Sequence, residues 1–196
     1  MDLVLVLDKS GSMYGLTSQV RAFASELVSQ FALSPTLTRV GVVEFSSSAR
    51  VLTGLSGSAS VVSSAIAGLS NAGGWTSISS GLERGKGLID AGGRPCAGEN
   101  CVVFLLTDGQ QSSQYGGSNA AVLSAAAVKA ADMRGFAGAF GGAQKGTLDA
   151  MASSPASQYS YLGTSLDDIR NHFQAFCNLV SSPQPPPLPP TMPAPP

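Results

Sequence analysis

The sequence predicts an α/β fold with a doubly wound, mostly parallel sheet and helices on both of its faces. Apolar runs of strand length alternate along the chain with segments whose apolar residues recur at helical spacing, which is typical of strand–helix–strand units. Two of these runs, residues 3–7 and 101–107, are strongly apolar, as strands buried on both faces are. The length of 196 residues suits one domain with a sizeable core.

In the first half of the chain, the strand at residues 3–7 precedes a helix with one apolar stripe. That stripe consists of Leu16, Val20, Phe23, Leu27 and Phe31. Residues 39–45 and 49–55 are expected to form two strands that are close enough to pair antiparallel, because only SSS separates them. Helices are expected at residues 61–69 and 77–91, on either side of the glycine-rich loop NAGGWTS.

The second half continues the alternation. The expected elements are a strand at 101–107, an alanine-rich helix at 119–134, a short strand at 136–140, a brief helix around Leu148 and Met151, and a last strand at 159–162. Ser165 is a suitable N-cap for a closing helix, with Asp168 in the capping-box position. The buried stripe of that helix is expected to consist of Leu166, Ile169, Phe173, Phe176 and Val180.

The end of the chain has a different composition. Nine of the twelve prolines follow Ser182, and no charged residue follows Arg170. Because proline fixes φ and lacks an N–H group, residues 183–196 are expected to form an extended proline-rich tail or linker. Recognition of this tail by proline-binding modules is the alternative. The folded domain is therefore expected to span residues 1–182.

Charge and hydropathy exclude several classes of protein. Eleven Lys and Arg against twelve Asp and Glu give a net charge of −1 without a basic cluster, so no nucleic acid is expected as a partner. No apolar run approaches the roughly 20 residues of a membrane helix, so no membrane insertion of this fragment is expected. No basic leader or cleavage site follows Met1. We therefore expect a mature or excised fragment, or a soluble protein of the cytosol or periplasm.

The three cysteines leave the redox compartment open. Cys96 and Cys101 bracket the short segment AGEN, and Cys177 lies on the last predicted helix. One disulfide plus one buried thiol is the preferred interpretation, in which any two of the three residues join. Three reduced thiols in a cytosolic protein are the alternative. A zinc site is not expected, because His172 is the only histidine that could join the cysteines.

Five oxygen-bearing side chains follow predicted elements in three separate segments. They are Asp8, Ser10 and Ser12 in DKSGSM, Thr76 in GGWTS, and Asp108 in LLTDG. Ligands of an open parallel sheet bind outside the carboxyl ends of its strands, where the strand order reverses. If the strands that end at Asp8 and Asp108 are neighbours across that point, both carboxylates reach one crevice. In the alternative, these residues are ordinary turn and cap residues.

The ligand types indicate binding of Mg²⁺ or Mn²⁺. Carboxylate and hydroxyl oxygens are hard ligands of the kind Mg²⁺ prefers. Two carboxylates and three neutral hydroxyls leave the metal with an incomplete shell, which should attract an acidic side chain of a partner. This is a mechanism of binding, and no catalytic residue is predicted. The chain contains neither a G-x-S-x-G elbow nor a P-loop.

DKSGSM, the separate Thr76 and LLTDG together resemble the von Willebrand factor A domain, as found in integrin I domains, with its metal-ion-dependent adhesion site. The likeness covers residues 2–180, including VGVVEFSSSARVL as the second and third strands. It implies a six-stranded sheet whose antiparallel edge strand is 49–55. It also implies that the metal site consists of Asp8, Ser10, Ser12, Thr76 and Asp108. Two features depart from familiar members, the bulky Trp75 directly before Thr76 and the glycine-rich FAGAFGG.

Three aromatic residues, Tyr14, Trp75 and Tyr115, lie in or just after the three segments that carry the expected ligands. Aromatic rings are common anchors of protein interfaces, so we expect these residues to form the rim of a ligand-binding surface. In the alternative, Trp75 packs inward and the two tyrosines are merely exposed.

These observations and the resemblance predict a non-enzymatic adhesion module that binds a protein or other acidic ligand through Mg²⁺. The proline-rich tail and a disulfide favour an extracellular, cell-surface or cell-wall location. An intracellular, cytoplasmic scaffold subunit of the same family is the alternative. A Mg²⁺-dependent phosphohydrolase with Asp8 as nucleophile is less well supported, because Ser10 stands where such enzymes have a second carboxylate. A purely structural module also stays open.

Overall fold

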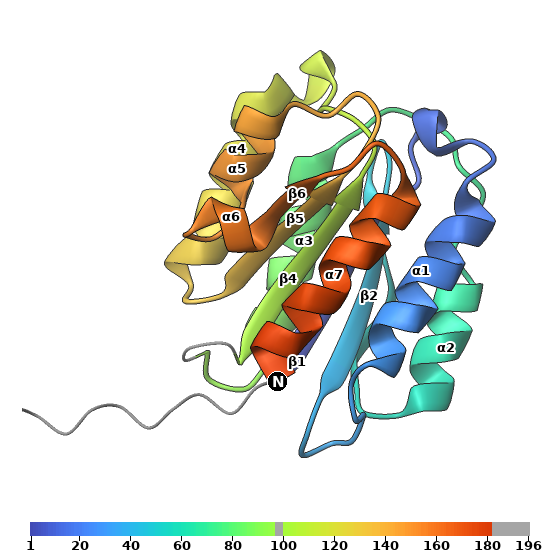
Figure 1. Cartoon of the computed structure of the whole chain (residues 1–196), viewed down its shortest axis with the longest axis vertical. Coiled ribbons are helices and arrows are strands. Elements are labelled where there is room, and N and C mark those ends of the chain that lie inside the picture. Colours follow the sequence, from blue (N-terminus) through green and yellow to red (C-terminus); the bar gives the residue numbers. More distant parts are fainter. Residues whose placement is uncertain (97–99, 182–196) are drawn as a thin grey trace, which may run out of the picture.

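A computed structural model describes residues 1–96 and 100–181, with residues 174–181 described by their backbone alone. Its six-stranded sheet has the order β3-β2-β1-β4-β5-β6 (Figure 1). The strands are β1 (Asp2–Asp8), β2 (Arg39–Phe45), β3 (Ala49–Ser56), β4 (Cys101–Thr107), β5 (Arg134–Ala139) and β6 (Ser160–Leu162). Neighbouring strands are parallel except β2 and β3, which pair antiparallel at one edge. The predicted fold class is confirmed.

Helices cover both faces of this sheet. Those of the described residues are α1 (Thr17–Ser29), α2 (Ala59–Ala67), α3 (Ile78–Gly92), α4 (Gly117–Ala130), α5 (Lys145–Met151), α6 (Ala156–Tyr159) and α7 (Leu166–Ser181), with short 3₁₀ turns η1 (Gly11–Met13) and η2 (Ser113–Tyr115). Helices α1, α2 and α7 lie together on one face, and α3, α4 and α5 cover the other (Figure 1). Within the described residues, no helix combines the length and apolar character needed to cross a bilayer.

The core is built around the central strands and the helix that closes the fold. Every residue of β1 and β4 is buried, which explains their continuous apolar sequences. Helix α7 places Phe173 edge-on against the rings of Phe104 and Phe136, with ring centroids 4.6 and 5.2 Å apart. The predicted capping box of α7 is confirmed, because the Asp168 backbone N–H donates to Ser165 and the Ser165 N–H donates to the Asp168 carboxylate.

Helix α3 packs against the sheet through two glycines that leave no room for a side chain. A Cβ atom on Gly81 would stand 2.8 Å from side-chain atoms of both Phe45 and Val6. A Cβ atom on Gly85 would stand 2.8 Å from Val6 as well. Side chains at these positions would force the helix outward. The two glycines therefore fix the position of the α3 N-terminus, which immediately follows the loop with Thr76.

Three predicted boundaries around β5 and β6 are wrong. The helix expected at 119–134 ends at Ala130, because Asp132 adopts a φ of 56°, which a helix does not allow. Strand β5 then starts at Arg134, which pairs in register with Val102 of β4. Tyr159, expected to open the last strand, is instead the final residue of α6.

At the amino ends of the central strands, the structure joins Cys96 to Cys101 through a disulfide. This selects one of the pairings that the sequence left open.

Near this disulfide, the buried Asp2 carboxylate accepts hydrogen bonds from Nε and Nη2 of Arg39, at 2.8 and 2.7 Å, and from the backbone N–H of Arg94 at 2.7 Å. The predictions for the side chains of Phe176, Cys177 and Val180 and for the tail at 183–196 lie outside the described residues.

Candidate metal centre

The carboxyl ends of β1 and β4 lie side by side, as the sequence predicted. Asp8, the last residue of β1, is buried, and its Oδ1 accepts a 2.7 Å hydrogen bond from the backbone N–H of Ser10. Its Oδ2 accepts a 2.6 Å hydrogen bond from the hydroxyl of Thr107, the last residue of β4. The first carboxylate is therefore held in a fixed orientation between the two central strands.

The loops after these two strands are joined directly through expected ligands. The Ser12 hydroxyl donates to Oδ1 of Asp108 over 2.7 Å, and the hydroxyl oxygens of Ser10 and Ser12 are 3.2 Å apart. Ser10 is almost fully buried, Ser12 is exposed, and Asp108 is 9% exposed. Asp8, Ser10, Ser12 and Asp108 thus form one cluster that opens to solvent at Ser12.

The loop that carries Thr76 is fastened to the loop after β1. The Gly11 backbone N–H donates to the Gly74 carbonyl over 2.9 Å, and the Gly73 N–H donates to the Lys9 carbonyl over 2.8 Å. A Cβ atom on Gly11 would lie only 3.2 Å from that Gly74 oxygen, and Gly74 itself has a φ of 86°. The two glycines allow a close approach of two backbones that larger residues would hinder.

Thr76 is also bonded to the loop after β4. The Thr76 backbone N–H donates to the Ser112 hydroxyl over 3.1 Å, and the Ser112 N–H donates to the Thr76 carbonyl over 2.9 Å. The buried Gln111 accepts a 2.7 Å hydrogen bond from the Ser79 N–H in the first turn of α3, and donates a 2.6 Å hydrogen bond to the Tyr115 carbonyl. The structure therefore brings together all three loops that carry the expected ligands.

The turn between β2 and β3 supports the same loop from a third side. The Trp75 N–H donates to the Ser47 hydroxyl over 3.0 Å, and the Ser77 N–H donates to the Ser46 carbonyl over 2.8 Å. Sequence reasoning missed the supporting residues Ser47, Thr107, Gln111 and Ser112. Their polarity next to the expected ligands was the available signal, but nothing in the spacing separated them from neighbours such as Ser48 or Ser113.

Burial disfavours the charged form of both carboxylates. Burial raises the pKa of Asp8 to about 6, although hydrogen bonds from Thr107 and Ser10 favour the charged form, and the charge of Asp108 adds to the rise. Burial also raises the pKa of Asp108, against the hydrogen bond from Ser12. Two partly desolvated acids that repel one another are an environment in which a bound cation is favourable.

The residues present fit a cation with hard oxygen ligands. The described residues contain no group of three or more His, Cys, Asp or Glu that could hold a metal ion, so a site here needs the hydroxyls. A hydroxyl that donates its hydrogen to a carboxylate, as Ser12 does to Asp108, keeps its oxygen lone pairs for another partner. The Thr76 hydroxyl has no hydrogen-bond partner among the described residues. The donor set therefore fits Mg²⁺ or Mn²⁺ better than a soft metal.

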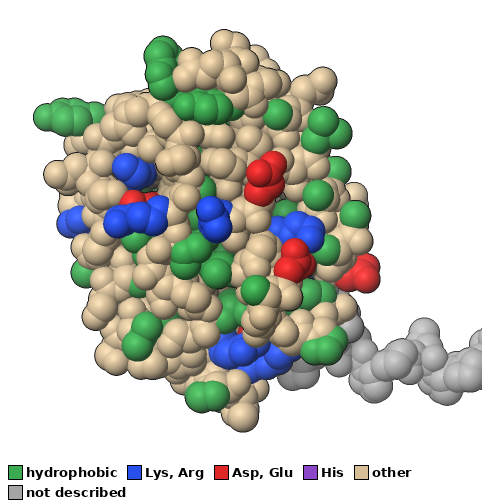
Figure 2. Space-filling view, turned by 180° about the vertical axis from the view of Figure 1, so that it is seen from behind, with side chains coloured by type: hydrophobic (Ala, Val, Ile, Leu, Met, Phe, Trp, Pro, Cys, Tyr) green, Lys and Arg blue, Asp and Glu red, His purple; other side chains and the backbone are tan. Residues whose placement is uncertain are grey.

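The expected aromatic rim is only partly exposed. Tyr14 is 85% exposed and Trp75 is 61% exposed, so the alternative in which Trp75 packs inward is wrong. Tyr115 is half-buried beside Gln111, whose amide bonds its carbonyl. Figure 2, seen from behind, shows hydrophobic side chains that protrude at the upper end of the molecule, where the carboxyl ends of the strands lie in Figure 1.

Comparison with known proteins assigns the chain to a family and identifies similar structures. The model of the von Willebrand factor type A domain matches residues 2–175. The structure of proximal thread matrix protein 1 from the mussel byssus, with a zinc-occupied metal-ion-dependent adhesion site, is 26% identical, with a TM-score of 0.75. That match covers 91% of this chain and 45% of the mussel protein, so this chain spans less than half of its relative's length.

Two bacterial surface proteins have the same fold at lower identity. The pilus adhesin SpaC from Lactobacillus rhamnosus GG, in its open conformation, matches 92% of this chain and 30% of its own, with 18% identity and a TM-score of 0.74. The corresponding domain of the type V pilus tip protein Mfa5 from Porphyromonas gingivalis matches 91% of this chain and 94% of its own, with 10% identity and a TM-score of 0.74. The chain is thus similar in fold to domains of adhesins and matrix proteins.

Proposed function

Because this chain belongs to the von Willebrand factor type A domain family, we propose that it is a divalent-cation-dependent adhesion module, which binds an acidic group of a partner protein. The observation that carries the proposal is the convergence of the three loops, above all the hydrogen bond between Ser12 and Asp108. It places hydroxyl and carboxylate oxygens from opposite halves of the chain at one opening. The similarity to a matrix protein with a zinc-occupied adhesion site adds support.

In this proposal, the five expected ligands have different roles. Asp8 and Asp108 provide the negative charge, and Ser10, Ser12 and Thr76 provide neutral oxygens. A bound Mg²⁺ or Mn²⁺ supplies a positive centre whose shell a carboxylate of the partner completes. The exposed rings of Tyr14 and Trp75 would then contact the partner around that carboxylate, with Tyr115 as the least accessible member of the rim.

Binding is better supported than catalysis. The single histidine of the chain, His172, stacks on Tyr161 with ring centroids 4.0 Å apart and an interplanar angle of 9°. Both residues belong to the β6–α7 part of the fold, whereas the expected metal ligands lie at the end of β1, after β4 and before α3.

An extracellular or cell-surface location is part of the proposal, and the Cys96–Cys101 disulfide is consistent with it. The tail at 183–196 would serve as a linker.

Metal-linked stabilisation tests the site itself. Thermal unfolding of the whole chain in chelator, Mg²⁺ or Mn²⁺ should show a saturable stabilisation, about 2.7 kcal/mol at a hundredfold excess over Kd. Asp108→Ala should abolish it. Asp90→Ala is the matched control, because Asp90 is an exposed acid that pairs with Lys86 on α3. If neither cation stabilises the unaltered protein, the proposal fails.

Recognition of an acidic group needs a separate measurement. Arrays of short peptides with one central glutamate, and the same peptides with glutamine, can be probed with the protein in Mg²⁺ or chelator. We expect retention on glutamate peptides in Mg²⁺ alone, and loss of that retention with Asp108→Ala. Equal retention on glutamine peptides would contradict the role of a partner carboxylate while leaving the metal site intact.

A further inference from the structure

The antiparallel strand β3 forms one edge of the sheet. Among the described residues it pairs with β2 alone, so its outer side presents unpaired backbone N–H and C=O groups. Proteins usually protect such edges with charged residues, proline or a covering element. The sequence of β3, ARVLTGLS, contains one charged residue and no proline. This edge is therefore chemically competent to accept another strand.

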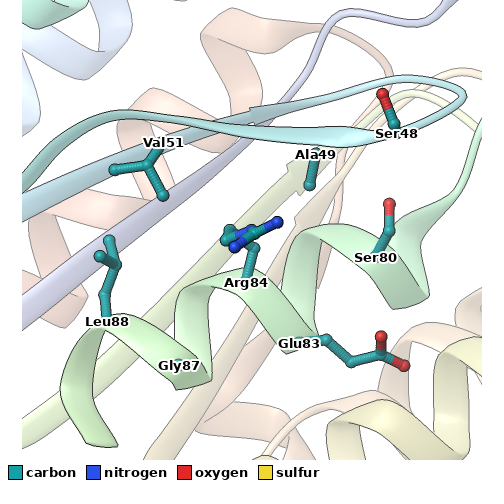
Figure 3. A pocket seen from close by; sticks show the side chains of 8 residues that line it. All are labelled: Ser48, Ala49, Val51, Ser80, Glu83, Arg84, Gly87 and Leu88. Carbon is teal, nitrogen blue, oxygen red and sulfur yellow. The ribbon is translucent and has the colours of Figure 1, made fainter. Parts of the chain in front are cut away.

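A groove accompanies β3 on each of its faces. On the face of α3, a groove of about 440 Å³ is lined by Ala49 and Val51 from the strand and by Arg84 and Leu88 from the helix (Figure 3). On the face of α2, a groove of about 500 Å³ is lined by residues that include Arg50, Leu52 and Val61. Because side chains alternate between the faces of a strand, a strand beside β3 would place its side chains into both grooves in turn.

The groove on the α3 face carries positive charge without an internal partner. Figure 3 shows Arg84 directed into the space under Ala49 and Val51. Within the described part of the chain, Arg84 makes no ion pair or hydrogen bond. Its neighbour Glu83 also lines the groove, but points away from Arg84 in Figure 3 and accepts a 3.0 Å hydrogen bond from Ser124 of α4. The charge of Arg84 is thus available to a ligand.

The other groove has a weaker charge of the same sign. Arg50 lines it with a side chain that is 62% exposed, and pairs with the buried carboxylate of Glu44 at 2.8 Å. Glu44 is further bonded by the Ser70 hydroxyl and backbone N–H. Arg50 is therefore held in place from within the protein while most of its side chain faces solvent.

We propose that the outer edge of β3 is a docking site for an extended, acidic polypeptide segment of a partner, which adds to the sheet as a further strand. Backbone hydrogen bonds to β3 would hold the segment, and an acidic side chain would pair with Arg84. The charge complementarity selects an acidic segment over a second copy of the same strand, because a copy would bring its own Arg50 and Arg84 to the interface.

The part of β3 with the most regular backbone geometry for pairing with an added strand lies next to the β2–β3 turn. Residues Ala49, Arg50 and Val51 pair in continuous register with β2, whereas the pairing shifts register between Val40 and Val43. This regular part adjoins Ser48, which also lines the α3 groove. The docking edge is distinct from the proposed metal site, so occupation of β3 does not require a cation.

A pair of peptides with opposite charge tests the inference. The probes are a short soluble peptide of alternating threonine and glutamate, and its analogue with lysine in place of glutamate. In chelator, the glutamate peptide should protect β3 backbone amides from hydrogen exchange, and the lysine peptide should not. Arg84→Glu should weaken this binding about tenfold. Lys86→Glu, an identical charge change on the same helix with its side chain paired to Asp90, should have less than about a twofold effect.

Three results would overturn the inference. They are equal binding of both peptides, equal effects of the two charge reversals, and protection confined to amides outside β3. A fourth result, self-association of the protein alone that sedimentation detects and Arg84→Glu alters, would also overturn it, because β3 would then be an interface between copies. Metal-linked stabilisation is measured without peptide, so failure of this inference leaves the proposed metal site untouched.

Discussion

The hydroxyl of Ser12 donates a 2.7 Å hydrogen bond to the carboxylate of Asp108, 96 residues away in the sequence. This bond connects the loop after β1 to the loop after β4 at the only member of the cluster that is exposed, Ser12. The bond therefore joins the two loops directly through two of the expected ligands.

The buried charge of Asp8 makes the metal-free protein sensitive to pH. Its pKa of about 6 in the folded state lies above the usual value near 3.9. Because the folded-state pKa is raised, the stability that the protonated Asp8 carboxyl contributes is complete below about pH 4 and is lost as the pH rises through 6. The loss amounts to about 3 kcal/mol of unfolding free energy. We therefore expect the unfolding free energy of Asp8→Asn, measured with denaturant in chelator, to exceed that of the unaltered protein by more at pH 7 than at pH 4.

Carboxyl groups whose pKa is lowered, among them Glu44 and Asp2, change stability with pH in the opposite sense and are present in both proteins. Hydrogen bonds from Ser70 and Arg50 outweigh burial and lower the pKa of Glu44, and Arg39 and Arg94 do the same for Asp2. The difference between the unaltered protein and Asp8→Asn therefore cancels the effects of Glu44 and Asp2, and reports on Asp8 together with its repulsion from Asp108. A difference that does not vary between pH 4 and 7 would contradict the raised pKa.

The single tryptophan should report cation binding directly. Trp75 precedes Thr76 in the chain, is 61% exposed, and is anchored by its backbone to Ser47. We expect the fluorescence emission of Trp75 to change as Mg²⁺ is added, and the change to follow a single saturable binding curve. The reason is that coordination by the Thr76 hydroxyl would change the local environment of the neighbouring indole ring. Thr76→Ala should remove this response. Leu123→Ala, at an exposed apolar position of α4, should preserve it.

Two glycines of α3 should respond oppositely to the same substitution. A Cβ on Gly81 would meet Phe45 and Val6 at 2.8 Å, whereas a Cβ on Gly87 has no neighbour within 4 Å. Gly81→Ala should destabilise the protein by roughly 1–3 kcal/mol through overpacking, and should weaken Mg²⁺ binding because α3 positions Thr76. Gly87→Ala should stabilise it by up to about 1 kcal/mol. Chemical denaturation of both variants measures the two effects, and equal signs would refute the packing argument.

Loss of the disulfide should lower stability without altering the metal site. The Cys96–Cys101 bond closes a short loop, for which chain entropy alone accounts for about 2 kcal/mol. The double replacement Cys96→Ser and Cys101→Ser should therefore shift denaturant unfolding by about that amount. Mg²⁺ affinity should be unchanged, since the bond lies at the amino ends of the strands. A reduced affinity would indicate coupling along β4.

The fold was largely predictable because its signals are strong and local. The continuous apolar runs of β1 and β4 can be accommodated only between two layers of helices, and their terminal aspartates then fall at the same edge. The boundary near Asp132 was not predictable, because the residues from Ala130 to Arg134 are all acceptable in a helix. Pairing of Arg134 with Val102 is a long-range interaction that overrides this local preference.

The positions of the candidate ligands were more predictable than those of the residues that support them. Asp8 ends β1 and Asp108 follows β4, so the strand order alone brings them together. Ser112 and Gln111 act through loop geometry, and only the structure distinguishes the serine that bonds the Thr76 backbone from its neighbours. The close contact between Gly11 and Gly74 likewise depends on two loops that no sequence pattern relates.

In Figure 1, strand β1 starts and helix α7 finishes at the lower end of the molecule, away from the loops that carry the candidate ligands. The two ends of the described fold therefore lie at the pole opposite the candidate ligands. A domain with this arrangement can be joined to other segments at both ends without a connection that crosses the surface proposed to bind a partner.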